Sequence, residues 1–184
     1  MERKSFAGMH CSVAQCLEVV GEWWTLLIVR DAFLGVTRFD EFQERLGISR
    51  NVLTQRLDHL VAAGILERTA YSEHPPRYDY RLTERGRDLW PVLNAMRQWG
   101  DKYAAPSGPP LQIVHEGCGH VFDAHQTCSE CGGTVGPRDV RAVPGPGAVE
   151  ALLRRPASES GSDPAAAPAT ARRPGRQRAA GRSR

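Results

Sequence analysis

Two pairs of potential metal ligands lie close together in the second half of the 184-residue chain. His115 and Cys118 form the first pair, Cys128 and Cys131 form the second, and nine residues separate the pairs. A spacing of two residues lets a tight turn point both side chains at one ion, and four such ligands suit tetrahedral zinc. The spacing therefore predicts a structural zinc site, which would stabilise a segment too short to form its own core.

Two alternatives remain open for this segment. His120 and His125 compete with His115 as the histidine ligand, and His115 is preferred because it gives both pairs the same spacing. The Cys128-x2-Cys131 pair could also act without a metal, as a redox-active dithiol. The symmetry of the two pairs favours the metal.

Cys11 is a further thiol, followed five residues later by Cys16. Five cysteines is an odd number, and the chain shows neither a secretion signal nor 18 consecutive apolar residues. These features indicate reduced thiols in a cytoplasmic protein. Because only His10 supplies a cation near Cys11, an inert and half-buried thiol is the simpler expectation there.

The clearest secondary-structure element that could position functional side chains is a helix that begins after Ser49. This serine is a favoured helix N-cap and Gly64 a helix terminator, so a helix is predicted between them, ending at Ala63. Apolar residues repeat on one side of that helix and polar residues on the other. The apolar side holds Leu53, Leu57, Leu60 and Val61, and the polar side holds Asn51, Thr54, Gln55, Asp58 and His59.

Further helices and a hairpin surround this helix. Apolar periodicity predicts helices over 13–20, 24–34 and 39–45, and a long amphipathic helix over 84–103 that is kinked at Pro91. Strands are predicted over 65–71 and 78–83, with a turn between them because its two prolines cannot enter a central ladder. This order is typical of a mainly α winged helix-turn-helix fold with a two-stranded β-wing.

A polar-faced helix of this kind fits the major groove of DNA, where its first side chains can reach base edges. Residues 1–105 carry equal numbers of acidic and basic side chains, so charge alone favours a solvated face. The ordered combination of helix and hairpin favours DNA instead. The expected contacts are Ser49, Arg50, Asn51, Thr54 and Gln55 in the groove, Arg56 at a phosphate, and His74 and Arg77 at the hairpin tip.

Residues 9 to about 105 resemble HxlR-type winged-helix transcriptional regulators of the MarR-like superfamily. The matching segments are CSV (11–13), GEWWTLLI (21–28), RFDE (38–41), GISRNVLTQRL (47–57), GILER (64–68), YRLTERG (80–86) and LWPVL (89–93). The resemblance implies a homodimer formed by the terminal helices, a palindromic operator, and a response to oxidants, electrophiles or small molecules. It also matches Cys11 to a thiol that some members use as a redox sensor, although Ser12 stands where the family often has proline.

Composition divides the chain into three parts: a winged-helix DNA-binding and dimerisation domain (1–105), a zinc-knuckle-like extension (106–143) and a Pro/Ala/Arg-rich tail (144–184). The tail is expected to be disordered, and its six arginines after residue 171 act as a solvated linker or add non-specific affinity for phosphate. The expected function is sequence-specific DNA-binding regulation of transcription, as repressor or activator. The alternative is a zinc-dependent protein-interaction module, and no constellation of residues indicates an enzyme.

Overall fold

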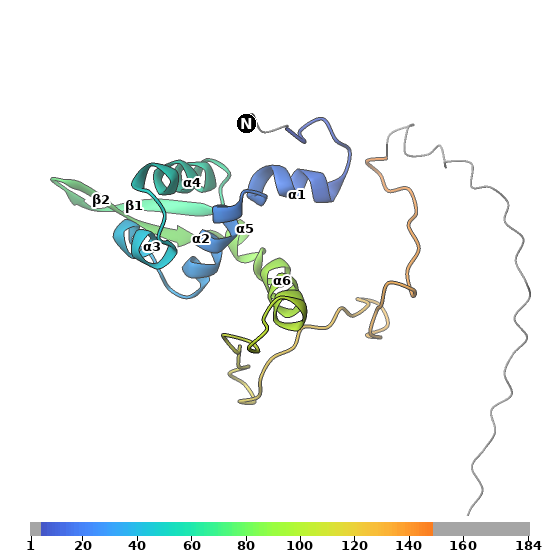
Figure 1. Ribbon diagram of the computed structural model, residues 1–184. Helices are drawn as coiled ribbons and strands as arrows, with labels where there is room; N and C mark the ends of the chain where they lie inside the picture. The colour runs from blue at the N-terminus through green and yellow to red at the C-terminus, as the bar shows by residue number, and fades with distance from the viewer. Residues whose placement is uncertain (1–4, 149–184) are drawn as a thin grey trace, which may run out of the picture.

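The computed structural model describes residues 5–148, in which helices predominate and one two-stranded sheet is present (Figure 1). The elements are α1 (Ser12–Val20), α2 (Trp23–Phe33), α3 (Phe39–Leu46), α4 (Arg50–Ala62), β1 (Leu66–Glu73), β2 (Pro76–Leu82), α5 (Glu84–Arg87) and α6 (Trp90–Tyr103). The predicted mainly helical fold with a two-stranded sheet is confirmed. Most of the tail that we expected to be disordered, residues 149–184, lies outside the described residues.

The core lies between α2, α3, α4 and the start of the sheet. Its fully buried side chains are Ile28, Val29, Phe42, Leu53, Leu57, Leu60 and Leu66. The three leucines of α4 recur at intervals of three and four residues, so one side of that helix is buried along its length. Burial of each such side chain contributes roughly 1.5–3 kcal/mol. This packing fixes the orientation of α4 and leaves its polar side outside.

The start of α4 is set by short-range signals in the sequence. Gly47 ends α3 with a φ of 63°, a left-handed conformation that glycine adopts without steric cost. The hydroxyl of Ser49 then accepts a hydrogen bond from the amide of Val52 at 3.3 Å, which caps α4. The predicted N-cap is confirmed, and the chain turns sharply from α3 into α4.

A buried carboxylate joins α2 to α3. Asp31 is fully buried, and its Oδ1 lies 2.8 Å from Nη2 of Arg30. Its second oxygen, Oδ2, lies 3.5 Å from Nε of Arg45 on α3. A buried charge is tolerated only when it is paired, so these arginines are part of the fold.

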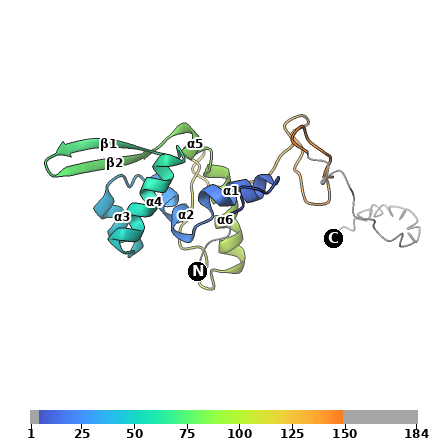
Figure 2. The same ribbon diagram turned by 90° about the horizontal axis from the view of Figure 1, so that it is seen from above.

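The hairpin of β1 and β2 projects beyond the helices (Figures 1 and 2). The strands pair from Leu66 opposite Leu82 to Glu73 opposite Pro76, so only residues 74–75 form the tip. The prediction of a turn over 72–77 is therefore wrong. Pro76 fits because it is the first residue of β2, where the missing N–H removes no essential ladder bond.

The chain after the hairpin forms two helices rather than one kinked helix. The hydroxyl of Thr83 accepts a hydrogen bond from the amide of Gly86 at 3.0 Å and caps the short α5. Pro91 lies in the first turn of α6, where backbone amides have no helical partner and proline causes no loss. The proline therefore starts a helix instead of bending one. Both α1 and α6 lie at the end of the molecule away from the wing tip (Figures 1 and 2).

The segment after α6 contains no regular helix or strand up to residue 148, but part of it is attached to α6. Nη2 of Arg97 donates to the carbonyl oxygen of Phe122 at 3.2 Å. The Gln98 amide, with its nitrogen toward the carbonyl of Ala124, makes two hydrogen bonds to that residue's backbone, at 3.2 and 3.1 Å. In the described part of the chain no single helix is long and apolar enough to cross a bilayer, and α1 with α2 would qualify only as a pair bent by 78°.

Candidate nucleic-acid interface

The amino-terminal end of α4 presents polar side chains to solvent. Four residues predicted to contact bases share this exposed face: Arg50, Asn51, Thr54 and Gln55. Ser49 is also exposed, although its hydroxyl is occupied in capping the helix. Because Leu53 and Leu57 hold the opposite side in the core, this polar face points away from the protein.

Two of these four side chains are held in place, and two have no partner. The hydroxyl of Thr54 donates to the carbonyl of Arg50 at 2.9 Å, and the Arg50 guanidinium lies 4.7 Å from the centroid of the Phe39 ring. Asn51 and Gln55 make no side-chain hydrogen bond within residues 5–148. A carboxamide carries a donor and an acceptor side by side, which matches the edge of adenine in the major groove. Asn51 and Gln55 are therefore best suited to read bases.

Arg56 forms an ion pair within the protein. Its side chain is only 26% exposed, and Nη2 lies 3.1 Å from Oε2 of Glu22, the N-cap residue of α2. This ion pair joins α4 to the start of α2. The expected phosphate contact stays a prediction, and to make it the guanidinium would have to leave Glu22.

The wing tip carries a cation well away from the core. His74 and Arg77 are both exposed, and neither side chain has a hydrogen bond or ion pair within the described residues. The base of the wing lies beside α4, as β1 and α4 are in contact. The tip and the exposed end of α4 are therefore available together to one elongated ligand.

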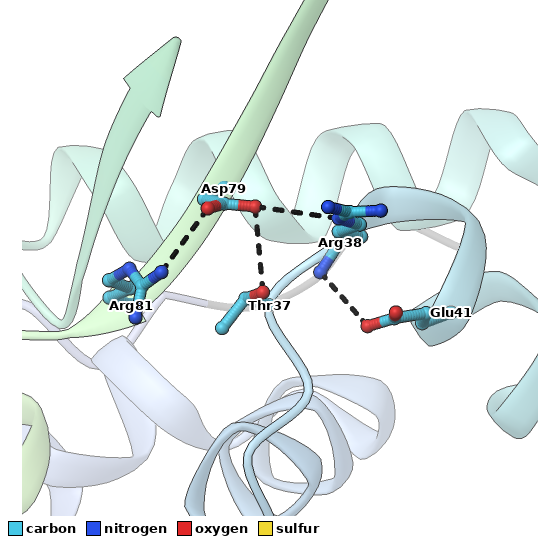
Figure 3. A network of polar contacts seen from close by, with 5 residues as sticks. All are labelled: Thr37, Arg38, Glu41, Asp79 and Arg81. Atoms are coloured by element: carbon cyan, nitrogen blue, oxygen red, sulfur yellow. Dashed lines mark hydrogen bonds and ion pairs between the residues drawn. The ribbon is translucent and has the colours of Figure 1, made fainter. Parts of the chain in front are cut away.

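Asp79 on β2 anchors the base of the wing to the start of α3 (Figure 3). Its carboxylate accepts hydrogen bonds from Nη2 of Arg81 at 3.2 Å and from Oγ1 of Thr37 at 3.5 Å. Its Oδ1 also lies 4.0 Å from Nε of Arg38. The amide of Arg38 in turn donates to Oε2 of Glu41 in the first turn of α3, at 3.4 Å. One carboxylate therefore couples the wing to the helix that precedes α4.

Two arginines near the base of the wing were not predicted to contact DNA. The guanidinium of Arg38 lies 5.1 Å from the centroid of the Tyr71 ring, and that of Arg68 lies 4.7 Å from the Tyr78 ring. Their side chains stay 59% and 41% exposed. Stacking on a ring restricts a flexible cation to one region. Each guanidinium also lies near a carboxylate, Arg38 at 4.0 Å from Asp79 and Arg68 at 3.4 Å from Asp58, so a contact with phosphate would compete with these pairs. The feature that identifies them is the aromatic ring beside each arginine. The sequence alone does not show these pairs, because they form only in the folded hairpin.

The Cys and His residues of the extension lie in two separate turns. In the first, Nδ1 of His115 is 3.2 Å from Sγ of Cys118, and the second contains Cys128 and Cys131. Hydrogen bonds from the backbone amides of Cys131 and Glu130, and then from the Cys131 thiol, lower the pKa of Cys128. Within residues 5–148 no three His, Cys, Asp or Glu side chains gather closely enough to hold one ion. The structure forms both predicted pairs without bringing all four side chains together.

Cys11 is exposed at the N-cap position of α1, so the expectation of a half-buried thiol is wrong. The reason is that α1 buries only Ala14 and Val20, and its first two residues, Ser12 and Val13, lie in solvent beside Cys11. Cys16, which lies further along this helix, is half-buried.

Large apolar side chains are exposed on the terminal helices and at the start of α2. They include Val13 on α1, Trp23 on α2, and Met96, Trp99 and Tyr103 on α6. Trp23 is 87% exposed and Trp99 63% exposed, which is unusual for the largest apolar side chain. Large exposed apolar side chains are typical of surfaces that bind other macromolecules.

A cavity of about 580 Å³ lies between α2, α6 and the beginning of the extension. Its lining is mainly apolar and includes Leu26, Phe33, Leu93, Leu111 and Ile113. Arg30 and Arg45, which pair with the buried Asp31, also line it. This volume falls within the range of small-molecule sites.

A helix with an exposed polar amino end, next to a hairpin anchored to the preceding helix, defines a winged helix-turn-helix protein. Residues 19–108 match the family model described as HxlR-like helix-turn-helix. The chain belongs to this family.

The matches with individual proteins extend further than the family model. Rv3095 of Mycobacterium tuberculosis (strain ATCC 25618 / H37Rv), an uncharacterised HTH-type transcriptional regulator, is 47% identical over 137 residues, which are 74% of this chain and 87% of Rv3095. The crystal structure of PA1607, a candidate transcription factor, matches with a TM-score of 0.68 and 39% identity over 76% of this chain and 99% of PA1607. PA1374 from Pseudomonas aeruginosa matches with a TM-score of 0.57 and 42% identity over 77% of this chain and 97% of PA1374. An alignment of 137 residues is longer than residues 1–108, so the similarity includes part of the extension.

Proposed function

We propose that this protein regulates transcription in the cytoplasm by binding a specific double-stranded DNA sequence as a homodimer. The observation that carries the proposal is the pair of unpartnered carboxamides, Asn51 and Gln55, on the exposed end of α4. Family membership and the description of Rv3095 as an HTH-type transcriptional regulator support DNA as the ligand. The end of α4 would lie in the major groove, and the wing tip would reach the neighbouring backbone or minor groove.

Selection from a pool of random duplex DNA tests this proposal. We expect the full chain to enrich a sequence with two-fold symmetry, in which the half-sites are one helical turn or a multiple of it apart, about 34–36 Å per turn. Absence of enrichment at low salt, for protein shown to be folded by circular dichroism, would contradict DNA recognition. That result would favour the alternative of a zinc-dependent protein-interaction module.

The wing is proposed to contact phosphate through Arg77, and the variant Arg77→Ala tests this contact. Loss of one phosphate contact should weaken binding to all duplexes by a similar factor, because phosphates carry no sequence information. The slope of log affinity against log salt concentration should become shallower by about one. Fluorescence anisotropy over a salt series measures both effects, with Arg138→Ala, an exposed arginine in the extension, as control. An unchanged slope in Arg77→Ala would remove this residue from the interface.

The homodimer is proposed to form through the exposed apolar faces of α1 and α6. Trp99 and Tyr103 lie 5.5 Å apart between ring centroids on the exposed side of α6, and Val13 is exposed on α1. A second copy of the chain would bury these side chains without covering the wing tip, since α1 and α6 lie at the opposite end of the molecule (Figure 2).

The variant Trp99→Asp is expected to raise the dimer dissociation constant by at least about 30-fold, because a buried tryptophan at an interface contributes about 2 kcal/mol or more. Sedimentation over a concentration series measures this change. Val140→Asp, which places the same charge at another exposed apolar position, should leave the constant unchanged. Equal constants for Trp99→Asp and the unmodified chain would place the dimer contact elsewhere.

Two kinds of signal remain predictions for this regulator, an oxidant and a small molecule. The exposed thiol of Cys11 is accessible to oxidants, which supports a redox signal. The apolar cavity between α2 and α6 supports a small-molecule signal, because a ligand there would touch both the core and a proposed dimer helix. The direction of regulation, repression or activation, also stays open to experiment.

A further inference from the structure

The two turns of the extension share one backbone construction. In the first, the amide of His115 donates to the carbonyl of His120 at 2.9 Å, and the amide of Gly119 donates to the carbonyl of His115 at 2.8 Å. In the second, the same two bonds run from Cys128 to Gly133 at 2.9 Å and from Gly132 to Cys128 at 2.9 Å. Gly119 and Gly132 both have a φ of 70°. Each residue of the second turn lies 13 positions after its counterpart, so the turns are structural repeats.

The repeat extends to the residues that flank each turn. An isolated antiparallel bridge pairs Val114 with Val121 around the first turn, and another pairs Thr127 with Thr134 around the second. Each turn is therefore closed at its base by the same kind of bridge. Such a turn holds its first and fourth residues on one side, and in both turns these positions carry the potential ligands.

The side chains at these positions are spaced as ligands of one ion. Nδ1 of His115 and Sγ of Cys118 are 3.2 Å apart. Two adjacent ligands of tetrahedral zinc, at bond lengths of about 2.0 Å for nitrogen and 2.3 Å for sulfur, lie roughly 3.5 Å apart. In the second turn the equivalent backbone hydrogen bonds, from Cys128 to Gly133 and from Gly132 to Cys128, place Cys128 and Cys131 at the corresponding two positions. Each turn thus has the shape of half a zinc site.

The segment between the turns is fixed near its middle to α6. Arg97 holds the carbonyl of Phe122, and Gln98 holds the backbone of Ala124. The first turn ends just before this attachment and the second begins shortly after it. Both turns are therefore tethered to the same short stretch of α6. His115, Cys118 and Cys131 are exposed and Cys128 is half-buried, so no core packing prevents the two turns from meeting.

We propose that His115, Cys118, Cys128 and Cys131 bind one Zn²⁺ ion, which draws the two turns together into a closed structural site. Four protein ligands leave no position open for substrate, so the site is structural rather than catalytic. The repeat also selects the histidine. His120 corresponds to Gly133, which is not a ligand position, and His125 lies between the turns. The proposal does not depend on DNA binding, because the ligands lie outside the residues that match the family model.

Metal content and cobalt substitution of the full chain test the proposal. Reduced protein should contain about one zinc per chain by elemental analysis, and Co²⁺ should produce thiolate charge-transfer bands and intense tetrahedral d–d bands. The variants Cys131→Ser and His115→Ala should each lower zinc affinity by more than about 100-fold, because loss of a direct ligand exceeds the 10- to 100-fold effect of losing an outer contact. Competition with a chelator of known affinity measures that change.

Two controls keep the outcome clear. Cys16→Ser removes a thiol outside the extension, and His120→Ala removes a neighbouring imidazole, so both should keep full zinc affinity. Far-UV circular dichroism and the urea transition verify that residues 12–103 remain folded in every variant. Intact reduced chain that takes up neither zinc nor cobalt would overturn the proposal, as would full zinc affinity in Cys131→Ser. Loss of zinc in His120→Ala with retention in His115→Ala would overturn the proposed ligand set.

Discussion

Replacing Asn51 by alanine is expected to weaken binding to the selected DNA sequence by roughly 5- to 150-fold, which corresponds to the 1–3 kcal/mol of a bidentate base contact. The carboxamide of Asn51 is exposed at the start of α4 and has no partner among the described residues. Its removal leaves a base edge without a hydrogen-bonding partner and should not disturb the core. Anisotropy titrations at one fixed salt concentration, with the selected site and its single-base variants, measure the effect.

The pattern across sequences is as informative as the size of the effect. Asn51→Ala should relax discrimination at one base pair of each half-site and leave the salt dependence unchanged, whereas Arg77→Ala should do the opposite. Gln112→Ala removes a comparable exposed carboxamide from the extension and serves as the matched control. If Asn51→Ala retained both its affinity and its base preferences, the end of α4 would not be the reading surface.

Replacing Phe42 by alanine is expected to lower the free energy of unfolding by about 3–5 kcal/mol. Phe42 is the largest of the fully buried side chains, and it lies on α3 against the helices that hold α4 in place. A domain of this size has a total stability of about 5–15 kcal/mol, so the variant should be partly unfolded at modest temperature. Urea denaturation followed by circular dichroism, at one protein concentration because a dimer is proposed, measures the change.

Val140→Ala is the control for that measurement, because its side chain is 61% exposed and its loss should change stability by no more than about 0.5 kcal/mol. A Phe42→Ala protein as stable as the control would mean that the space collapses around the smaller residue or that α3 does not belong to the cooperative core. The second result would conflict with the packing between α3 and α4.

The sequence predicted best the structural features that depend on residues close together in the chain. The N-cap Ser49 was identified because a hydroxyl and the amide three residues later are enough to form the cap. The buried side of α4 followed from the spacing of its leucines. The two turns of the extension were visible as a repeated spacing of potential metal ligands.

The sequence was less informative where an interaction joins residues far apart in the chain, or where one residue fits two local structures equally well. The ion pair of Arg56 was not predicted, because nothing near this residue in the sequence indicates Glu22, which lies 34 positions earlier and meets it only in the folded chain. Pro91 was taken as a kink, although proline is equally suited to the first turn of a new helix. Arg38 was missed because its position beside the wing depends on Asp79, 41 residues later.

The contacts of Asp79 limit which binding sites one subunit can accept. Since this carboxylate ties the hairpin to the loop that enters α3, and α3 packs on α4, the contacts hold the wing and α4 in one relative position. The length of duplex spanned by one subunit is then constant. In the proposed dimer, a single base pair inserted within a half-site should therefore abolish its recognition. A change in the spacer between half-sites would alter only the contact between the two subunits.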